Sequence, residues 1–285
     1  MCIRDRIRRE CEAYARKYID HQRTQFKRLG VFGDWDNPYL TIDKKYEAEE
    51  LRLFADVVEK GFVYRGKKPV YWSLPCRTAL AEAEVEYADH VSQSVFVKFP
   101  VVAEDNTHLL IWTTTPWTLP ANLAVAFNSL FTYTKVRVNG EVILVERTLL
   151  PKVAETCGWE EFDQIETLQG DAVGALEYRH PFINKTARIF EGDNFVDNAP
   201  GTGFVHIAPG HGMDDNHLGC ANNLPIYCPV DDDGKFCHTT DLPAADQMPA
   251  ALLGKSILEI IASARRQRPT VRHFRLCTRV CSQVL

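Results

Sequence analysis

Hydrophobic positions recur at helical spacing in two segments near the start of the chain. In segment 10–29 the apolar residues fall on one helical face and Gly30 follows them; the face comprises Cys11, Tyr14, Ala15, Tyr18 and Ile19. The same spacing recurs in segment 45–60, at Leu51, Phe54, Ala55 and Val58, and Gly61 stands at the C-terminal end. We predict two helices, over 10–29 and 45–60.

The pattern changes to strands after these helices. Short strands are predicted in "FVYR", "PVYWS" and "VEY", and longer ones in "SVFVKF", "HLLIWTT" and "LAVAF". Segment 132–146 alternates apolar and polar residues on both sides of Asn139-Gly140, which favours a two-residue hairpin turn. Further strands are expected in "DAVGALEY", "ARIFEG" and "GFVHIA", and short helices at 147–156 and 256–264. These elements predict an α+β fold with a helical entry of about 60 residues.

Composition limits the functional classes. The chain has 285 residues, of which 45% are hydrophobic and 25% charged, an ordinary globular balance. It has no apolar stretch long enough to span a membrane, and its basic start lacks the apolar core of a signal peptide. Nine widely spaced cysteines with no C-x-x-C pair are typical of reduced thiols in a cytoplasmic protein. We expect no membrane partner and no bound metal.

Charge is distributed unevenly along the chain. Segment 1–30 has a net charge of +5 and segment 255–285 a net charge of +6. Because the total is −5, the segment between them carries −16. A body this acidic is not a general nucleic-acid-binding surface, so any contact with nucleic acid must be local and specific.

Two stretches concentrate candidate chemistry. "IWTTTPWTLPAN" places three hydroxyls at the end of an apolar strand, and "GTGFVHIAPGHGMDDN" leads a strand into a glycine-rich loop and two aspartates. Each feature has a plain structural alternative: threonine favours strands, His206 suits a core position, and Asp214 and Asp215 suit a helix N-terminus. His206, His211 and Asp215 are also possible metal ligands, although their spacing matches no common zinc motif.

Taken together, the two stretches offer more than either offers alone. Hydroxyls, an imidazole and carboxylates can bind an ammonium group and a ribose and can orient a water molecule. No G-x-S-x-G nucleophile motif and no phosphate-binding P-loop is present. A protein nucleophile and nucleotide-phosphate chemistry are therefore not indicated.

Both stretches closely resemble the signatures of the editing domain of isoleucyl-tRNA synthetases, which are class I aminoacyl-tRNA synthetases. The flanks "RLGVFGDWDNPYLT" and "KPVYWSLPCRTALAEAEVEY" resemble the segment that leads from the catalytic domain into this insertion. The resemblance runs from about residue 11 to 264. It implies a β-barrel-like editing domain at 86–264, preceded by a helical remnant of the catalytic domain at 1–85 and followed by a basic tail at 265–285 that does not fit the family.

The resemblance also implies roles for individual residues. The catalytic group would be Thr113, Thr114, Thr115, Asn122 and Asp215, which position the ester and the water and bind the substrate ammonium. The substrate-binding group would be Trp117 and Thr118 on the adenosine side, His206 as a wall of the side-chain pocket, and Asp214 and His211 as weaker candidates. The implied partner is the acceptor end of tRNA(Ile), bound by a cytoplasmic monomer.

The implied reaction is hydrolysis of valine from mischarged tRNA(Ile). One methylene distinguishes isoleucine from valine and is worth only about 1–3 kcal/mol in a pocket, a limit for which this synthetase is itself the standard example. No cofactor is expected for this step.

The chain departs from the family at several points. It lacks the His-Ile-Gly-His and Lys-Met-Ser-Lys-Ser signatures of the synthetic site, so ATP and Mg²⁺ belong to a parent enzyme and we expect the chain to be a fragment. The C-x-x-C that holds zinc in some relatives is reduced to Ser73 and Cys76. Two alternatives stay open: a module that binds the tRNA acceptor end without hydrolysis, and a metal-dependent hydrolase using His206, His211 and Asp215.

Overall fold

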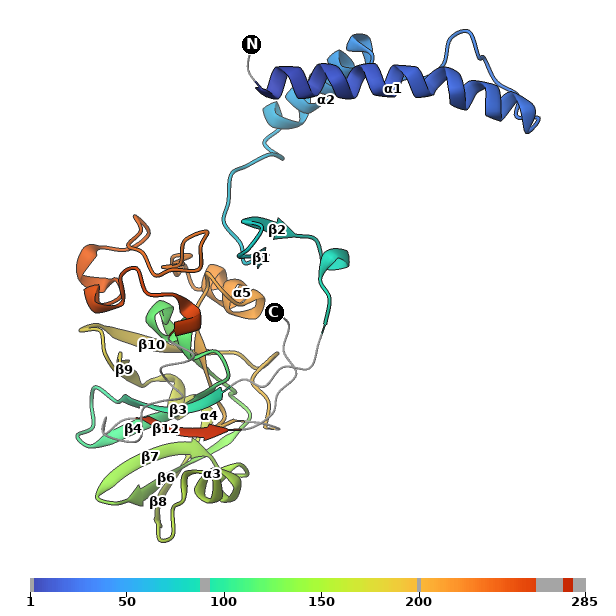
Figure 1. Cartoon of the computed structure of the whole chain (residues 1–285). Coiled ribbons are helices and arrows are strands. Elements are labelled where there is room, and N and C mark those ends of the chain that lie inside the picture. Colours follow the sequence, from blue (N-terminus) through green and yellow to red (C-terminus); the bar gives the residue numbers. More distant parts are fainter. Residues whose placement is uncertain (1–2, 88–92, 199–200, 260–273, 279–285) are drawn as a thin grey trace. The chain divides into compact units, whose positions relative to one another are not determined.

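The computed structural model describes residues 3–87, 93–198, 201–259 and 274–278, and it divides the chain into two compact units (Figure 1). The first is Met1–Gly66 and the second is Lys67–Leu285. The sequence-based division at 85 and 264 stays a prediction. No helix in the described ranges is long and apolar enough to cross a membrane.

The first unit contains two helices, α1 (Ile3–Arg28) and α2 (Lys44–Glu59), as the helical spacing predicts. α1 begins earlier than predicted because residues 3–9 contain no helix breaker. Each helix is followed by a glycine with positive φ, +78° at Gly30 and +75° at Gly61, a conformation that glycine adopts without strain. Neither helix buries a side chain within the described part of the chain.

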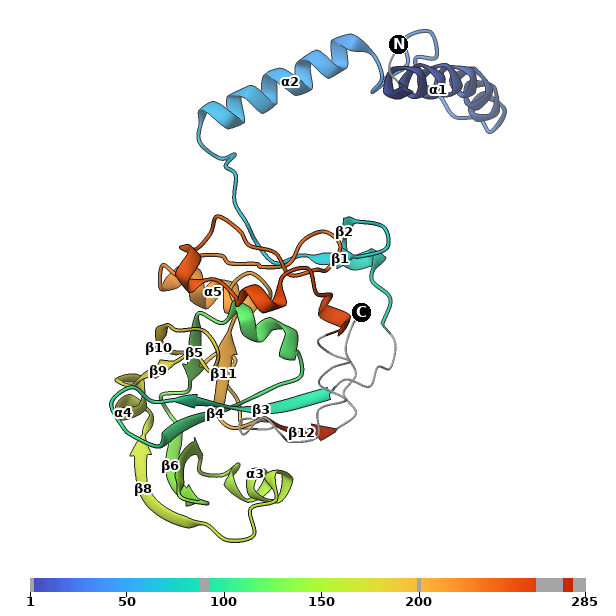
Figure 2. The same ribbon diagram turned by 60° about the vertical axis from the view of Figure 1, so that its left-hand side comes forward.

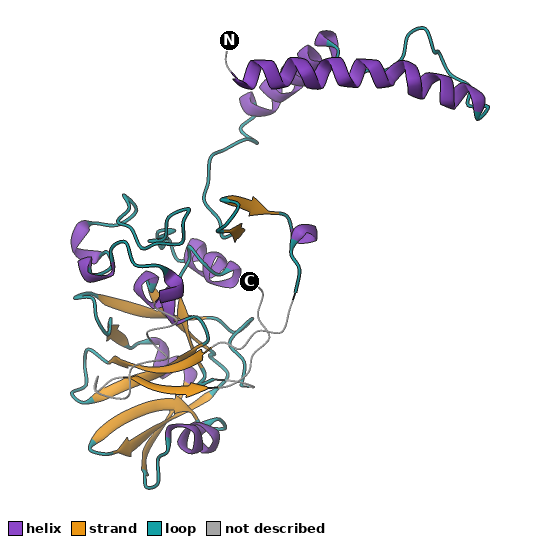
Figure 3. Cartoon of the chain, viewed as in Figure 1, coloured by secondary structure: helices purple, strands orange, loops and turns teal. Residues whose placement is uncertain are grey.

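The second unit is built mainly from two sheets (Figure 3). The larger has the strand order β12-β3-β4-β7-β6-β8, from β3 (Gln93–Pro100), β4 (Thr107–Thr113), β6 (Thr132–Val138), β7 (Glu141–Glu146), β8 (Asp163–Gln169) and β12 (Phe274–Thr278). β6 and β7 form the predicted hairpin, in which Asn139 and Gly140 have φ of 50° and 82°. The prediction from Asn-Gly is confirmed because this turn needs two positive φ angles.

The smaller sheet has the order β11-β5-β10-β9, from β5 (Ala124–Phe127), β9 (Glu177–Arg179), β10 (Thr186–Glu191) and β11 (Phe204–Ile207). β5 is its buried central strand, parallel to β10 and antiparallel to β11. A separate two-stranded ribbon pairs β1 (Tyr71–Ser73) with β2 (Thr78–Leu80). The predicted α+β class is confirmed.

The expectation of a barrel-like domain is wrong in one respect, because neither sheet closes in the described residues. A barrel requires hydrogen-bonded ladders around the whole circumference. In the described part of the chain an isolated bridge, Val101 to Tyr178, joins the end of β3 to β9. The two sheets are therefore open, and they pack face to face.

The main hydrophobic core lies between these two sheets. Val97, Phe99 and Ile111 of the larger sheet pack with Val125 and Phe204 of the smaller one, and all five are buried. A second cluster lies on the other face of the larger sheet, beneath α3 (Leu150–Cys157), which runs beside β6 and β8 (Figures 1 and 2). The predicted helix at 147–156 thus corresponds to α3.

Several local predictions need correction. "DAVGALEY" is not one strand but a short helix, α4 (Gly170–Gly174), followed by β9. A Cβ at Gly170 would lie 2.3 Å from the carbonyl oxygen of Ser129, so close packing determines this turn. "FVYR" and "VEY" form no strand, whereas β2 and β8 were not predicted. Of the helix expected at 256–264, residues 257–259 are helical, and the part after residue 259 lies outside the described residues.

The remaining elements are short and follow the signals of their sequences. α5 (Met213–Ala221) begins at the two aspartates, as predicted. The described part of the unit also contains four 3-10 helices: η1 (Glu82–Glu84), η2 (Pro116–Ala121), η3 (Ala244–Asp246) and η4 (Ala250–Leu252). Among these, η2 follows directly from the end of β4 and carries the second half of the threonine-rich stretch.

Candidate functional site

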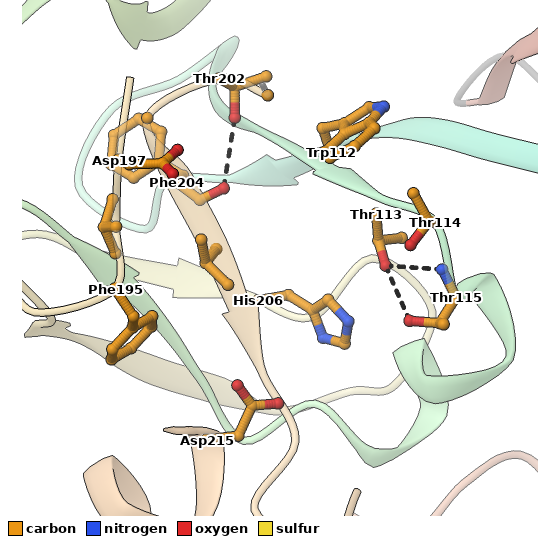
Figure 4. A pocket seen from close by; sticks show the side chains of 14 residues that line it. Trp112, Thr113, Thr114, Thr115, Phe195, Asp197, Thr202, Phe204, His206 and Asp215 are labelled. Atoms are coloured by element: carbon orange, nitrogen blue, oxygen red, sulfur yellow. Dashed lines mark hydrogen bonds between the residues drawn. The ribbon is translucent and has the colours of Figure 1, made fainter. Parts of the chain in front are cut away.

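A pocket of about 340 Å³ lies where the end of β4 meets β11 (Figure 4). Four segments line it: residues 112–115, 195–197, 201–206 and 215. Its volume falls in the range that holds small ligands in proteins. The two stretches identified from the sequence, which are about 90 residues apart in the chain, therefore form one site.

The threonines form a linked set of hydroxyls at the end of β4. Thr113 is buried, and its Oγ1 accepts the backbone N–H of Thr115 at 3.1 Å. The hydroxyls of Thr113 and Thr115 lie 3.3 Å apart. Thr115 leaves the strand conformation, with φ −122° and ψ 66°, and Pro116 then begins η2. Pro116 thus turns the chain away and leaves the hydroxyls at the pocket.

His206 is held by Thr118. The Thr118 hydroxyl lies 2.8 Å from the carbonyl oxygen of Thr115 and 3.0 Å from His206 Nε2. The hydroxyl has one proton, which it must donate to the carbonyl, so His206 Nε2 is the donor in the second contact. His206 Nδ1 is then an acceptor, and it is buried without a hydrogen-bond partner in the described chain.

Burial keeps the His206 imidazole neutral at physiological pH. Its pKa falls to about 4, mainly through burial and secondarily through the nearby His211. A neutral ring that lines the pocket does not repel a bound cation. The lining of the pocket thus includes an uncharged ring with one acceptor nitrogen.

In addition to Asp197, Asp215 supplies a carboxylate to the pocket, from the first turn of α5. Its Oδ2 accepts the N–H of Ala208 at 3.1 Å. Burial raises its pKa from 3.8 to about 6, against the Ala208 hydrogen bond, and the charge of Asp214 adds to the rise. A Cβ at Gly212 would lie 2.7 Å from this Oδ2, so the glycine leaves room for the carboxylate. At pH 7.5 the group is an ionised and partly desolvated anion, which suits an ammonium ligand.

The structure brings some of the predicted site residues together at the pocket and leaves the others outside its lining. Thr113, Thr114, Thr115, His206 and Asp215 line the pocket, with Thr118 in contact with His206. The other four, Trp117, Asn122, Asp214 and His211, do not line it.

Each of these four residues has its own surroundings. Asn122 is fully buried, and its amide group donates to Ala124 O and accepts the hydroxyl of Tyr178. Trp117 packs edge-on against His211, with 5.0 Å between ring centroids, and Asp214 is exposed. These hydrogen bonds connect Asn122 with β5 and β9, and the role that the resemblance implies for it stays a prediction.

Sequence reasoning missed several lining residues. The segment Phe195, Val196 and Asp197 reaches the pocket from another part of the chain and has no sequence signal of its own. The Gly201-Thr202-Gly203 turn is marked in the sequence by its two glycines. Gly203 has φ +81°, and a Cβ there would lie 2.3 Å from the Cβ of Glu146. Its glycines indicate close packing against the neighbouring strand.

The described lining of this pocket includes histidine and aspartate, which are side chains of the types that bind metal ions. Among the residues that the structure describes, which include His206, His211 and Asp215, no three His, Cys, Asp or Glu side chains are grouped to hold a metal ion. The geometry therefore gives no support to the metal-dependent hydrolase.

Comparison with known proteins identifies the family. Residues 2–252 match the family model of class I tRNA synthetases (I, L, M and V). The chain is 49% identical over 230 residues to the isoleucine–tRNA ligase of Petrotoga mobilis, and 48% identical over 242 residues to that of Macrococcus caseolyticus. These matches cover 81% and 82% of this chain, but only 25% and 26% of the relatives.

Among solved structures, the leucyl-tRNA synthetase editing domain of P. knowlesi matches with a TM-score of 0.47 and 10% identity, over 67% of this chain and 98% of that one. The GlLeuRS-CP1 structure matches with a TM-score of 0.40 and 16% identity, over 48% and 70%. The sequence matches confirm the resemblance to isoleucyl-tRNA synthetases, and the chain spans about a quarter of the length of these relatives. The chain belongs to the class I tRNA synthetases of the isoleucine, leucine, methionine and valine group.

Proposed function

We propose that this chain carries the editing site of an isoleucyl-tRNA synthetase and hydrolyses the valine ester of mischarged tRNA(Ile). The observation that supports this most is one pocket lined by threonine hydroxyls, a neutral imidazole and a desolvated carboxylate. None of the described residues that line it is a serine, cysteine or lysine. This set suits attack by water and offers no obvious covalent nucleophile.

In the proposed reaction Asp215 binds the α-ammonium of the valyl group. The threonine hydroxyls at the end of β4 hold the ribose and the ester and orient a water molecule. The water oxygen forms a bond to the ester carbonyl carbon, and the bond from that carbon to the ribose oxygen breaks. The water proton passes to the ribose oxygen, so that free valine and tRNA leave. Orientation and electrostatics supply the acceleration.

His206 forms the wall beside the amino-acid side chain. Because its ring is neutral, it places no second positive charge beside the substrate ammonium. Its position is fixed by the Thr118 hydroxyl, so the wall cannot turn aside without losing a buried hydrogen bond. This rigidity is what a pocket needs to accept valine and exclude one further methylene.

The test is single-turnover hydrolysis of valyl-tRNA(Ile) by the full chain, with Asp215→Ala beside Asp214→Ala. Loss of one charge-assisted contact predicts a fall of about 10- to 100-fold for Asp215→Ala. The Asp214 variant, altered at the exposed neighbour, keeps a rate close to wild type. Equal rates for wild type and Asp215→Ala would contradict the proposal. Tight binding of the tRNA by a folded wild-type chain that does not hydrolyse it would favour the binding module.

A further inference from the structure

Three side chains from the β9–β10 hairpin form hydrogen bonds with the chain where η2 ends. The hydroxyl of Tyr178 donates to Asn122 Oδ1 at 2.7 Å. His180 Nε2 lies 3.0 Å from the carbonyl oxygen of Leu119, and Lys185 Nζ lies 2.7 Å from that of Asn122. The backbone carbonyl of Asn122 follows the last residue of η2, where helix carbonyls have no partner within the helix, and Lys185 supplies one.

The proton positions on His180 follow from its neighbours. Its Nδ1 accepts two backbone N–H groups, from Phe182 at 3.3 Å and Ile183 at 3.1 Å. The proton of the neutral ring is therefore on Nε2, which donates to Leu119 O. Burial, with the charge of Lys185 next, lowers the His180 pKa to about 3, so the ring keeps this form at physiological pH. His180 thus connects the hairpin turn to η2 through a defined set of hydrogen bonds.

The other end of η2 reaches the pocket. Thr118 donates its backbone N–H and its hydroxyl proton to the carbonyl oxygen of Thr115, and its hydroxyl accepts from His206. The last backbone hydrogen bond of η2 runs from Asn122 N–H to Leu119 O at 3.1 Å. Leu119 O therefore accepts both from η2 itself and from His180. A continuous series of contacts joins the hairpin to the threonine hydroxyls.

We propose that His180 and Lys185 are positioning residues for the pocket: by holding the carbonyls of Leu119 and Asn122, they keep η2 where Thr115 and Thr118 meet His206. Neither residue lines the pocket. The effect on hydrolysis rests on the proposed function, whereas the effect on η2 does not. His180 and Lys185 would contribute by orienting the groups of the pocket, and the rate of a reaction depends strongly on small displacements of its reacting groups.

Lys185 gives this arrangement a pH dependence. Burial lowers its pKa from 10.5 to about 8, and the charge of Asp246 on η3 opposes the shift. The titratable groups that pack beside this contact do not change charge: His180 is neutral, as is His206 beyond it, and burial raises the pKa of Tyr178 well above 10. Below pH 8 Lys185 is charged and its hydrogen bond to Asn122 O is strong. Above pH 8 it loses its charge and the bond weakens.

The experiment compares the full wild-type chain with Lys185→Met and Lys185→Arg, and with Lys152→Met as a control at an exposed lysine. Two quantities are measured from pH 6 to 9.5: amide hydrogen exchange at Thr118 and Asn122, and the single-turnover rate on valyl-tRNA(Ile). In the Lys185→Met variant these two amides are expected to exchange faster than in the wild type. Hydrolysis at saturating protein is expected to be about tenfold slower, because the variant loses one hydrogen bond from a charged donor.

The pH dependence separates positioning from general stability. The ratio of wild-type to Lys185→Arg rates is expected to be constant up to pH 7.5 and to fall above pH 8, because arginine stays charged. A ratio that is flat across pH 8, or unchanged exchange and rate in Lys185→Met, would overturn the inference. If the folded wild-type chain hydrolyses nothing, the proposed function fails, and the exchange of the Thr118 and Asn122 amides still decides the positioning role.

Discussion

Replacing Asp215 with asparagine is expected to stabilise the fold while removing activity. In the folded chain the Asp215 pKa is raised from 3.8 to about 6. A group with a raised pKa contributes stability that is fully present below pH 3.8 and is lost as pH rises through 6. At pH 7.5 the buried carboxylate therefore costs about 3 kcal/mol, from 1.36 kcal/mol for each pKa unit.

Of two local effects, one reduces this gain and the other leaves it unchanged. Asp215 is in the first turn of α5, where a negative charge is worth about 0.3–1 kcal/mol, and asparagine loses that term. Asparagine keeps the hydrogen bond from Ala208 N–H, since its Oδ1 is also an acceptor. The net expectation is a gain of about 2 kcal/mol at pH 7.5, or about 4–8 °C in Tm for a unit of this size.

The assay is urea and thermal unfolding of wild type and Asp215→Asn at pH 7.5 and pH 4, followed by tryptophan fluorescence, with Asp214→Asn as the exposed control. The gain should shrink towards zero at pH 4, where the wild-type carboxyl is protonated. Asp214→Asn should change stability much less. A variant that is less stable than wild type at pH 7.5, or a gain that is the same at both pH values, would refute the reasoning.

Three further predictions follow. Acid should destabilise the fold between pH 6 and 4, because burial lowers the pKa of three histidines to about 3 or 4: His180, His206 and His211. The unfolded chain takes up protons at these histidines in this range, which costs about 1.4 kcal/mol of stability per histidine and pH unit, and Asp215 offsets one such amount. Urea titrations should therefore show a net loss of about 3 kcal/mol in unfolding free energy for each pH unit. Stability that is flat over this range would contradict those shifts. Tyr178→Phe should cost about 1–3 kcal/mol in unfolding free energy, because it leaves the buried Asn122 oxygen unpaired; a neutral effect would show that another donor replaces the hydroxyl. Gly212→Ala should lower the deacylation rate while thermal unfolding changes little, because the new Cβ displaces the Asp215 carboxylate; an unchanged rate would refute that close approach.

Local signals in the sequence were sufficient for some elements. The β6–β7 hairpin was predicted because Asn139 and Gly140 adopt positive φ without help from the rest of the fold. Both helices of the first unit were predicted from spacing alone. The clustering of Thr113–Thr115, His206 and Asp215 was predicted as well, though only through the family resemblance, since nothing local connects β4 with β11.

Tertiary contacts decided what the sequence could not show. "DAVGALEY" is rich in apolar residues, yet its first half belongs to the helix α4, whose Gly170 and Gly174 pack closely against Ser129 and Phe127. The polar, exposed strand β8 shows no alternation of apolar residues and pairs only because β6 offers a free edge. His180 and Lys185 act on η2 through backbone carbonyls, and such contacts leave no pattern in the residues that accept them.

The most direct test of the central claim is the ratio of single-turnover hydrolysis rates for valyl-tRNA(Ile) and isoleucyl-tRNA(Ile), measured with excess wild-type chain at pH 7.5. The account predicts that valine is released faster by about 10- to 200-fold, the discrimination that one methylene allows in a rigid pocket. Equal rates for the two esters, or no hydrolysis of either by a folded chain, would contradict it.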